Sequence, residues 1–272
     1  MSNCNCGSIQ QIGDGGLKFG GAGTVLFDIN SQGGLLFGGK GTVTTNDIYD
    51  SYLLALPLIE LESPYIDLSS QHRNAASIGI PTNPSDGVFC SISQEFLITN
   101  GVGSLLQLPP DNTATTYSFS AWILIEGNFK QKTIYSSGNN FNGFDCVFSV
   151  ETSYINHLVA TIKTDTESVA VYSATVLETD RWYHIAVTYD KSALTLFING
   201  IKNNTVAVTG LPLPASNNCY VGSKDKASFW TGNLQEIRIT SEVKDSDWFT
   251  AERKNFCGQL VSMGGEQTVT EI

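Results

Sequence analysis

The stretch Arg181–Asp190, RWYHIAVTYD, is the most informative segment of the chain for its fold, and LTLFING at Leu194–Gly200 follows it closely. Successive side chains of a β-strand point to opposite faces of its sheet. In RWYHIAVTYD both of these faces are substantially apolar. They consist of Tyr183, Ile185, Val187 and Tyr189 on one side, and of Trp182, His184, Ala186 and Thr188 on the other. The pattern therefore predicts a central strand that is covered on both sides.

Strand patterns continue outward from this segment in both directions. Asn199-Gly200 supplies the positive φ angles of a hairpin turn. Many short strands at near-regular spacing, with turn residues between them, predict a sandwich or a barrel. The strongest patterns lie at Tyr117–Ile125, Lys132–Ser137, Phe144–Glu151, His157–Lys163, Ser168–Thr175, Arg181–Tyr189, Leu194–Ile198, Val206–Val208, Cys219–Gly222 and Gly232–Thr240. One helical turn is expected at Lys244–Arg253, capped by Asp245, Ser246 or Asp247.

Five motifs occur in a fixed order: FSAWI, WYHIAVTYD, LTLFING, VGS and GNLQEIRI. Their order and spacing resemble the laminin-G-like domain of the concanavalin A-like lectin and glucanase superfamily, and the pentraxin-type branch is the most similar. The resemblance covers about Leu53 to Phe256. It implies an all-β protein whose residues 50–257 form an antiparallel jelly-roll β-sandwich. The residues expected in its structural core are Trp122, Trp182 and His184.

An internal repeat precedes this domain. GGLKFGGAGTV at Gly15–Val25 recurs as GGLLFGGKGTV at Gly33–Val43, with nine of eleven positions identical. Each copy reads as a β-hairpin, and two hairpins carry too little apolar surface to be stable alone in water. We therefore expect residues 1–49 to be a Gly-rich arm that docks onto a larger assembly, and residues 258–272 to be a tail. The apolar residues of the arm are Leu17, Phe19, Leu35 and Phe37.

Charge and hydropathy exclude two classes of partner. The formal net charge is −11, which disfavours the phosphates of nucleic acids and anionic membrane surfaces. No apolar stretch approaches the roughly 18 residues that span a bilayer. The first residues have neither the basic region nor the apolar core of a signal peptide, so we expect synthesis and folding in a cytoplasm.

The superfamily includes glucanases, so catalysis has to be considered. Retaining enzymes of this fold place two acids of a Glu-x-Asp-x-(x)-Glu pattern on one strand face, about 5–5.5 Å apart. Glu178-x-Asp180 begins such a pattern, but Trp182, Tyr183 and His184 follow where the second Glu should be. Asp165-x-Glu167 fails in the same way, so we predict no catalytic residues and no enzyme.

Two loops are the candidates for binding. Related domains hold Ca²⁺ through oxygen ligands at a rim of the sandwich, and the candidate ligands here are Asn139 and Asp145. Sugars offer hydroxyls to Asn and Asp and a C–H face to aromatic rings. The predicted glycan-binding residues are Asn140, Asn142, Asp145, Asp225, Phe229 and Trp230.

These features favour a non-enzymatic structural or adhesion protein of a virion, such as a phage head-decoration or tail-associated protein made in the host cytoplasm. The arm would attach it to other virion proteins as part of an oligomer or lattice, and its sandwich would present a surface to cell-surface glycans. Two alternatives stay open, namely a purely structural cement protein that binds no glycan, and an extracellular carbohydrate-binding lectin.

Overall fold

A computed structural model describes Tyr49 and residues 51–60, 62–78, 83–88, 92–99, 102–110, 114–127, 132–137, 148–152, 156–213, 218–224, 226 and 228–256. Residues 1–48 of the predicted N-terminal arm, with Leu17, Phe19, Leu35 and Phe37, and the predicted tail lie outside the described residues.

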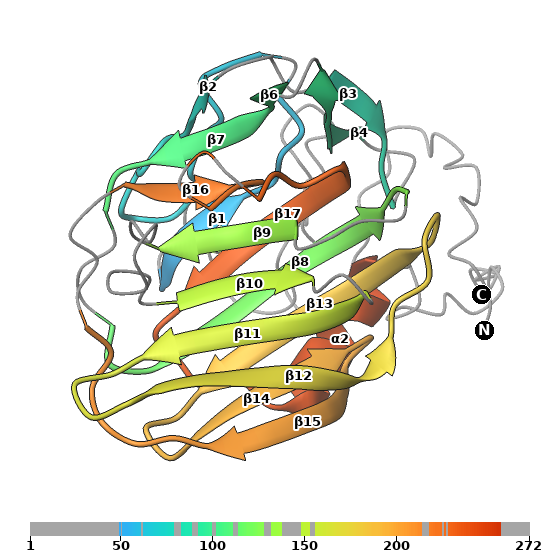
Figure 1. The fold of residues 1–272 in the computed structure, drawn as a ribbon. Helices are drawn as coiled ribbons and strands as arrows, with labels where there is room; N and C mark the ends of the chain where they lie inside the picture. Colours follow the sequence, from blue (N-terminus) through green and yellow to red (C-terminus); the bar gives the residue numbers. More distant parts are fainter. Residues whose placement is uncertain are drawn as a thin grey trace, which may run out of the picture.

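Two antiparallel sheets face each other (Figure 1). The order in the first sheet is β15 (Ile201–Ala207), β14 (Ala193–Ile198), β13 (Trp182–Tyr189), β8 (Tyr117–Ile125), β17 (Gly232–Thr240), β4 (Ile92–Phe96) and β3 (Asn83–Asp86), and β1 (Tyr52–Leu56) pairs with the second half of β17. The order in the second sheet is β12 (Ser168–Val176), β11 (His157–Lys163), β10 (Phe148–Thr152), β9 (Lys132–Ser137), β16 (Cys219–Val221), β7 (Leu105–Leu108) and β2 (Ala76–Ile78). A small separate hairpin joins β5 (Ile98–Thr99) to β6 (Val102–Gly103). The prediction of an all-β antiparallel sandwich is confirmed.

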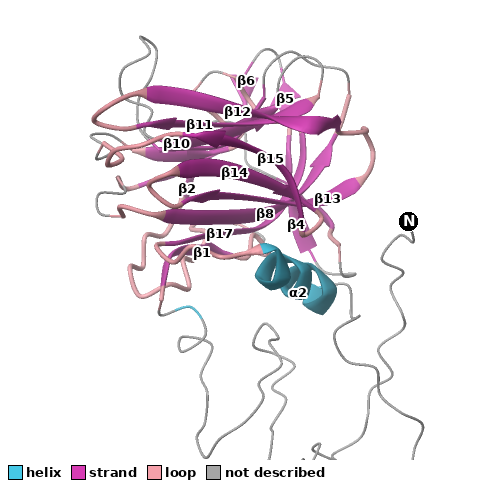
Figure 2. Ribbon diagram, turned by 90° about the horizontal axis from the view of Figure 1, so that it is seen from below, coloured by secondary structure: helices cyan, strands magenta, loops and turns pink. Residues whose placement is uncertain are grey.

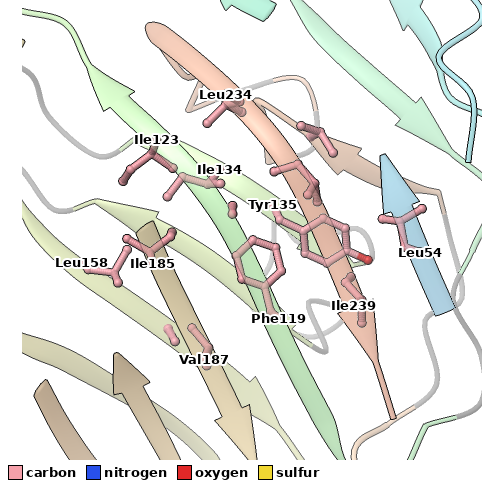
Figure 3. Packing of buried hydrophobic residues seen from close by; sticks show 14 of the residues in the cluster. Leu54, Phe119, Ile123, Ile134, Tyr135, Leu158, Ile185, Val187, Leu234 and Ile239 are labelled. Atoms are coloured by element: carbon pink, nitrogen blue, oxygen red, sulfur yellow. The ribbon is translucent and has the colours of Figure 1, made fainter. Parts of the chain in front are cut away.

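Between the sheets lies one hydrophobic core. Tyr183, Ile185, Val187 and Tyr189 of β13 all belong to it, so the alternation read from RWYHIAVTYD is confirmed. Phe119 of β8 meets Tyr135 of β9 from the opposite sheet (Figure 3), and the centroids of the two rings are 5.7 Å apart. Burial of these side chains supplies the main favourable free energy of folding.

Helix α2 (Ser246–Phe256) covers the outer face of the first sheet (Figure 2). The Asp245 carboxylate caps it by accepting a hydrogen bond from the Trp248 N–H across 2.9 Å. Phe249 packs there against Ala186 and Phe197. The predicted helical turn is thus a longer helix, and it explains why the second face of β13 is apolar as well. Among the described residues no helix has the length and apolar character needed to cross a membrane.

Two local predictions differ in extent from the structure. The Asn199-Gly200 turn has the expected positive φ angles of 54° and 82°. β15 nevertheless begins directly after it at Ile201, whereas the sequence predicted a short strand at Val206–Val208. Most of β15 is exposed and polar, so its pairing with β14 is not visible in a hydrophobic pattern. The other difference is at β10, which begins at Phe148 rather than Phe144, and residues 144–147 lie outside the described residues.

Candidate functional site

Strand β9 shows that the two predicted binding loops start from opposite ends of the sandwich. At its first end, the Thr133 N–H donates to the Ser228 carbonyl across 2.9 Å, next to Phe229 and Trp230. At its other end, Ser137 pairs with Phe148, and these two residues bracket the segment with Asn139, Asn140, Asn142 and Asp145. A strand rises about 3.3 Å per residue, so six residues separate the two ends by about 17 Å. The described residues therefore do not bring the two loops together into one site.

We name the first of these ends the Lys132 rim and define it by Glu95, Glu126, Lys132, Asp180 and residues 228–231. Asp225, predicted to bind glycans, lies outside the described residues, as do the four residues of the other loop and with them both predicted calcium ligands. Phe229 and Trp230 can be placed.

Trp230 is a core residue. Its side chain has 0% exposure and belongs to the cluster between the sheets. The backbone N–H of Trp230 donates to the Gly222 carbonyl across 2.8 Å. A ring with no accessible surface cannot stack on a sugar, so the prediction that Trp230 contacts a glycan is wrong. The sequence pattern showed an aromatic residue beside Phe229, but it could not show which of the two turns inward.

Phe229 lies at the surface of the rim and is half-buried. Its ring rests on Gly103 of β6, where an added Cβ would come within 2.1–2.5 Å of three Phe229 carbon atoms. The Phe229 ring can therefore occupy this position only because Gly103 has no side chain. Of the described residues in the predicted glycan-binding set, Phe229 is the one with accessible surface.

Beneath the rim, the Lys132 side chain joins the start of its own strand β9 to the end of β8 and the start of β17. Its ammonium group donates to the carbonyl oxygens of Glu126 at 2.6 Å and Thr231 at 3.1 Å, and it lies 5.8 Å from the centroid of the Trp230 ring. The residue is only 3% exposed. Burial lowers the pKa of Lys132 to about 8, although the nearby Glu126 charge acts in the opposite direction. Sequence reasoning missed this residue; the available signal was a lysine at the first position of a strand.

The exposed side of the same rim is acidic. Partial burial raises the pKa of Glu126, and the negative charges of Glu95 and Asp180 raise it further. The backbone places both residues by the end of β8: the Asp180 N–H donates to the Ile125 carbonyl across 2.9 Å, and Glu95 and Leu124 both pair with Asn233 of β17. The rim therefore combines a half-buried aromatic ring with carboxylates that can accept hydrogen bonds.

The acid pairs considered for glucanase chemistry have other contacts. Oδ1 of Asp165 accepts a hydrogen bond from the Leu211 N–H at 2.8 Å, and Oε1 of Glu167 accepts one from the Thr209 N–H at 2.8 Å. Glu178 is exposed and pairs with Arg181 at 3.1 Å. Each contact fixes a turn or lies in solvent, and none of them places two acids across a cleft.

Trp122 and His184, expected in the structural core, are buried to 2% exposure but do not lie between the sheets. They alternate with the core residues of their strands, so they face outward, beneath helix α2. Their ring centroids are 5.2 Å apart. Trp182, at the start of β13, is half-buried. The outer face of the first sheet thus carries a second, smaller packed layer.

Metal binding has no support among the described residues, because no three His, Cys, Asp or Glu side chains gather closely enough to hold an ion. The calcium ligands Asn139 and Asp145 are outside this set, and their role stays a prediction.

Comparison with known proteins gives one match to a family and many to structures. A family model described as the concanavalin A-like lectin/glucanases superfamily matches residues 100–248, which is more than half of the chain. A search of curated proteins finds no match.

Among the similar structures is the binding domain of Paraclostridial Mosquitocidal Protein 1, with a TM-score of 0.61 and 13% identity over 78% of this chain and 53% of that one. Another is a botulinum neurotoxin type C structure whose title states that cell entry depends on interaction with two ganglioside molecules, with a TM-score of 0.56 and 15% identity over 78% and 53%. A third is domain 4 of AbnA, an extracellular arabinanase from Geobacillus stearothermophilus, in complex with arabinotriose, with a TM-score of 0.59 and 16% identity over 74% and 97%. The chain spans about half the length of the two toxin chains. At these identities the likeness shows the fold alone.

Proposed function

The chain belongs to the concanavalin A-like lectin/glucanase superfamily, and we propose that it acts as a lectin-like module that binds glycans without cleaving them. The observation that carries this proposal is the Lys132 rim, where a half-buried aromatic ring and several carboxylates lie at strand ends that Lys132 joins by hydrogen bonds. Loops held by a rigid scaffold are where binding residues concentrate.

Rigidity of the rim supports binding because it lowers the entropy that a ligand has to remove. Lys132 fixes the carbonyls of Glu126 and Thr231 by hydrogen bonds. Gly103, which has no side chain, leaves the space that the Phe229 ring occupies. The ring can therefore offer a preformed apolar surface to the C–H face of a sugar. Asp225 precedes Phe229 by four residues, and its carboxylate is proposed to accept hydrogen bonds from the hydroxyl groups of the sugar.

The charge of the rim indicates the kind of glycan. Burial raises the pKa of Glu126, and the negative charges of Glu95 and Asp180 raise it further. A sialylated or sulfated sugar would add a further negative charge to this cluster. We therefore expect neutral sugars or amino sugars to bind in preference to anionic ones.

The carboxylates support the non-enzymatic part of the proposal. Asp165 and Glu167 accept hydrogen bonds from backbone groups. Glu236 and Glu252 are 13% and 7% exposed, and each lies 2.8 Å from Arg238. Retaining hydrolysis needs two acids on either side of a bound sugar ring, and these four are engaged elsewhere.

Binding to a glycan array tests the proposal with the full chain. We expect neutral or amino glycans to be retained, and Phe229→Ala to weaken their binding by about tenfold, the loss expected for one stacked ring. Tyr172→Ala is the matched control, because Tyr172 is an aromatic residue of β12 with 55% exposure that lies outside the rim. Equal loss in both variants would contradict a site at the rim.

We further propose that the module is displayed on a virion, attached through residues 1–49 to other virion proteins or to copies of itself. Removing residues 1–48 should then abolish incorporation into particles while glycan binding persists. Incorporation of a chain that binds no glycan would favour the purely structural cement role. Glycan binding by a chain that joins no particle would favour the extracellular lectin.

A further inference from the structure

A group of buried charges lies on the outer face of the first sheet, beneath helix α2. Arg238 of β17 donates from Nη2 to Oε2 of Glu236 at 2.8 Å, and from Nη1 to Oε1 of Glu252 at 2.8 Å. The three side chains are between 7% and 13% exposed. We name these residues, together with His184 and Tyr49, the Arg238 cluster.

Glu252 connects helix α2 to three strands. Its Oε1 accepts hydrogen bonds from Arg238 of β17 and, at 3.1 Å, from the Ser120 hydroxyl of β8. Its Oε2 lies 3.2 Å from Nε2 of His184 in β13. One carboxylate of the helix is therefore in contact with the middle of the sheet.

Tyr49 joins the cluster from the opposite end of the domain sequence. Nη2 of Arg238 donates to the Tyr49 hydroxyl at 3.3 Å, and the guanidinium lies 5.4 Å from the centroid of the tyrosine ring. The Tyr49 ring also meets the Tyr52 ring edge-on, with centroids 5.7 Å apart. Tyr49 is the residue through which residues 1–48 continue into β1.

Backbone geometry places the charges in this arrangement. Glu236 has a φ of 55°, although it is not glycine and lies within β17. The register of β17 against β8 shifts between Gln235 and Arg238, which marks a β-bulge. A non-glycine residue in this conformation is strained and persists where its surroundings fix it. Its N–H donates to the Pro57 carbonyl at 3.2 Å, and its carboxylate pairs with Arg238.

A buried ion pair is by itself weak evidence of stability. Well-packed apolar residues often give equal or greater stability than a buried ion pair, which indicates that stability alone does not explain the charges. Their particular geometry instead joins two segments that enter and leave the sandwich. Tyr49 ends the N-terminal segment, and helix α2 leads into residues 257–272.

We propose that Arg238 is an anchoring residue that makes Tyr49 and helix α2 one cooperative unit. A pulling force on residues 1–48 is then transmitted through Tyr49 to Arg238 of β17 and to α2. The force therefore does not act on the pairing of β1 with β17 alone. This inference deepens the proposed attachment through residues 1–49 and rests on it, whereas the coupling itself can be measured without any assembly or glycan.

Hydrogen–deuterium exchange of the full chain tests the coupling. Tyr49→Ala leaves all the charges in place, so the sandwich should stay folded. Loss of a hydrogen bond to a charged group is worth roughly tenfold in an opening equilibrium. We expect about that increase in exchange at residues 246–256, which are far from Tyr49 in sequence, and no change at β9.

Tyr172→Ala, on the other sheet, is the matched control and should leave α2 unchanged. Arg238→Lys keeps one positive charge but cannot reach both carboxylates and Tyr49 with a planar fork, so it should loosen α2 and residues 51–56 together. A change confined to residues 51–56 in Tyr49→Ala would overturn the proposal, as would a uniform increase across both sheets. Glycan binding by these variants should stay at the level of the unmodified chain, so failure of the coupling and failure of glycan recognition give different results.

Discussion

Glu252 of helix α2 accepts a hydrogen bond from Arg238 of strand β17 across 2.8 Å, at a place where neither side chain is more than 12% exposed. This pair fixes the helix to the outer face of the sheet. It also explains why β8 carries Trp122, and β13 carries His184, on a face that is turned away from the other sheet.

Glu252→Gln should destabilise the protein by about 3 kcal/mol at neutral pH, because it leaves buried partners without their counter-charge. Burial raises the pKa of Glu252, but the His184 hydrogen bond and the Arg238 charge outweigh it and hold the pKa at about 2, below the usual 4.5. A lowered carboxyl pKa contributes stability that is present above 4.5 and is lost as the pH falls through about 2. The difference in unfolding free energy between the two proteins should therefore shrink over that range. Urea titrations at several pH values measure it, and a constant difference would contradict the assignment.

Lys132→Met should remove a rise in the free energy of unfolding that the unmodified protein shows between pH 8 and 10. The pKa of Lys132 is lowered to about 8 in the folded protein from 10.5. Between these values the unfolded chain binds more protons, so stability should rise with pH, by on the order of 2 kcal/mol from pH 8 to 10. Above pH 10 the raised pKa of Tyr52, about 12, acts in the opposite direction. Thermal melts from pH 7 to 10 should lose the rise in Lys132→Met and keep it in Lys202→Met, an exposed lysine of β15.

Gly103→Ala should displace the Phe229 ring, because the new Cβ would lie 2.1–2.5 Å from ring and Cβ atoms of Phe229. Overpacking of this kind costs about 1–3 kcal/mol. A double-mutant cycle isolates the cause. In a Phe229→Gly background, which removes all three of these carbon atoms, the same glycine substitution should cost almost nothing, and an equal cost in both backgrounds would assign the effect to the backbone of β6.

Gly200→Ala should loosen helix α2 as well as the hairpin turn. Gly200 has a φ of 82°, and an added Cβ would lie 2.8–2.9 Å from backbone atoms of Thr250. Helix backbone cannot move aside as a side chain can, so both strain and overlap apply, and we expect a loss of about 2 kcal/mol or more. Amide exchange in 246–256 reports the loosening. Unchanged exchange with a lower melting temperature would restrict the effect to the turn.

Local sequence was sufficient for the strands that carry the fold. The alternation of Tyr183, Ile185, Val187 and Tyr189 is a property of neighbouring residues, and it correctly placed these side chains in the core. Asn199-Gly200 predicted its turn for the same reason. The order of the five motifs identified the superfamily, which the family model matches.

Contacts between distant residues were decided by the tertiary structure. Whether Phe229 or Trp230 is exposed depends on Gly103 and on the core, which lie far away in sequence. The separation of the two predicted loops follows from the direction of β9. Arg238 meets Tyr49 across 189 positions of sequence. The sequence by itself determined which segments become strands and which of their faces is apolar, because hydrophobic alternation is local. The pairing of strand ends and the meeting of buried charges arise when the two sheets and helix α2 close around their cores, so only the folded chain decided them.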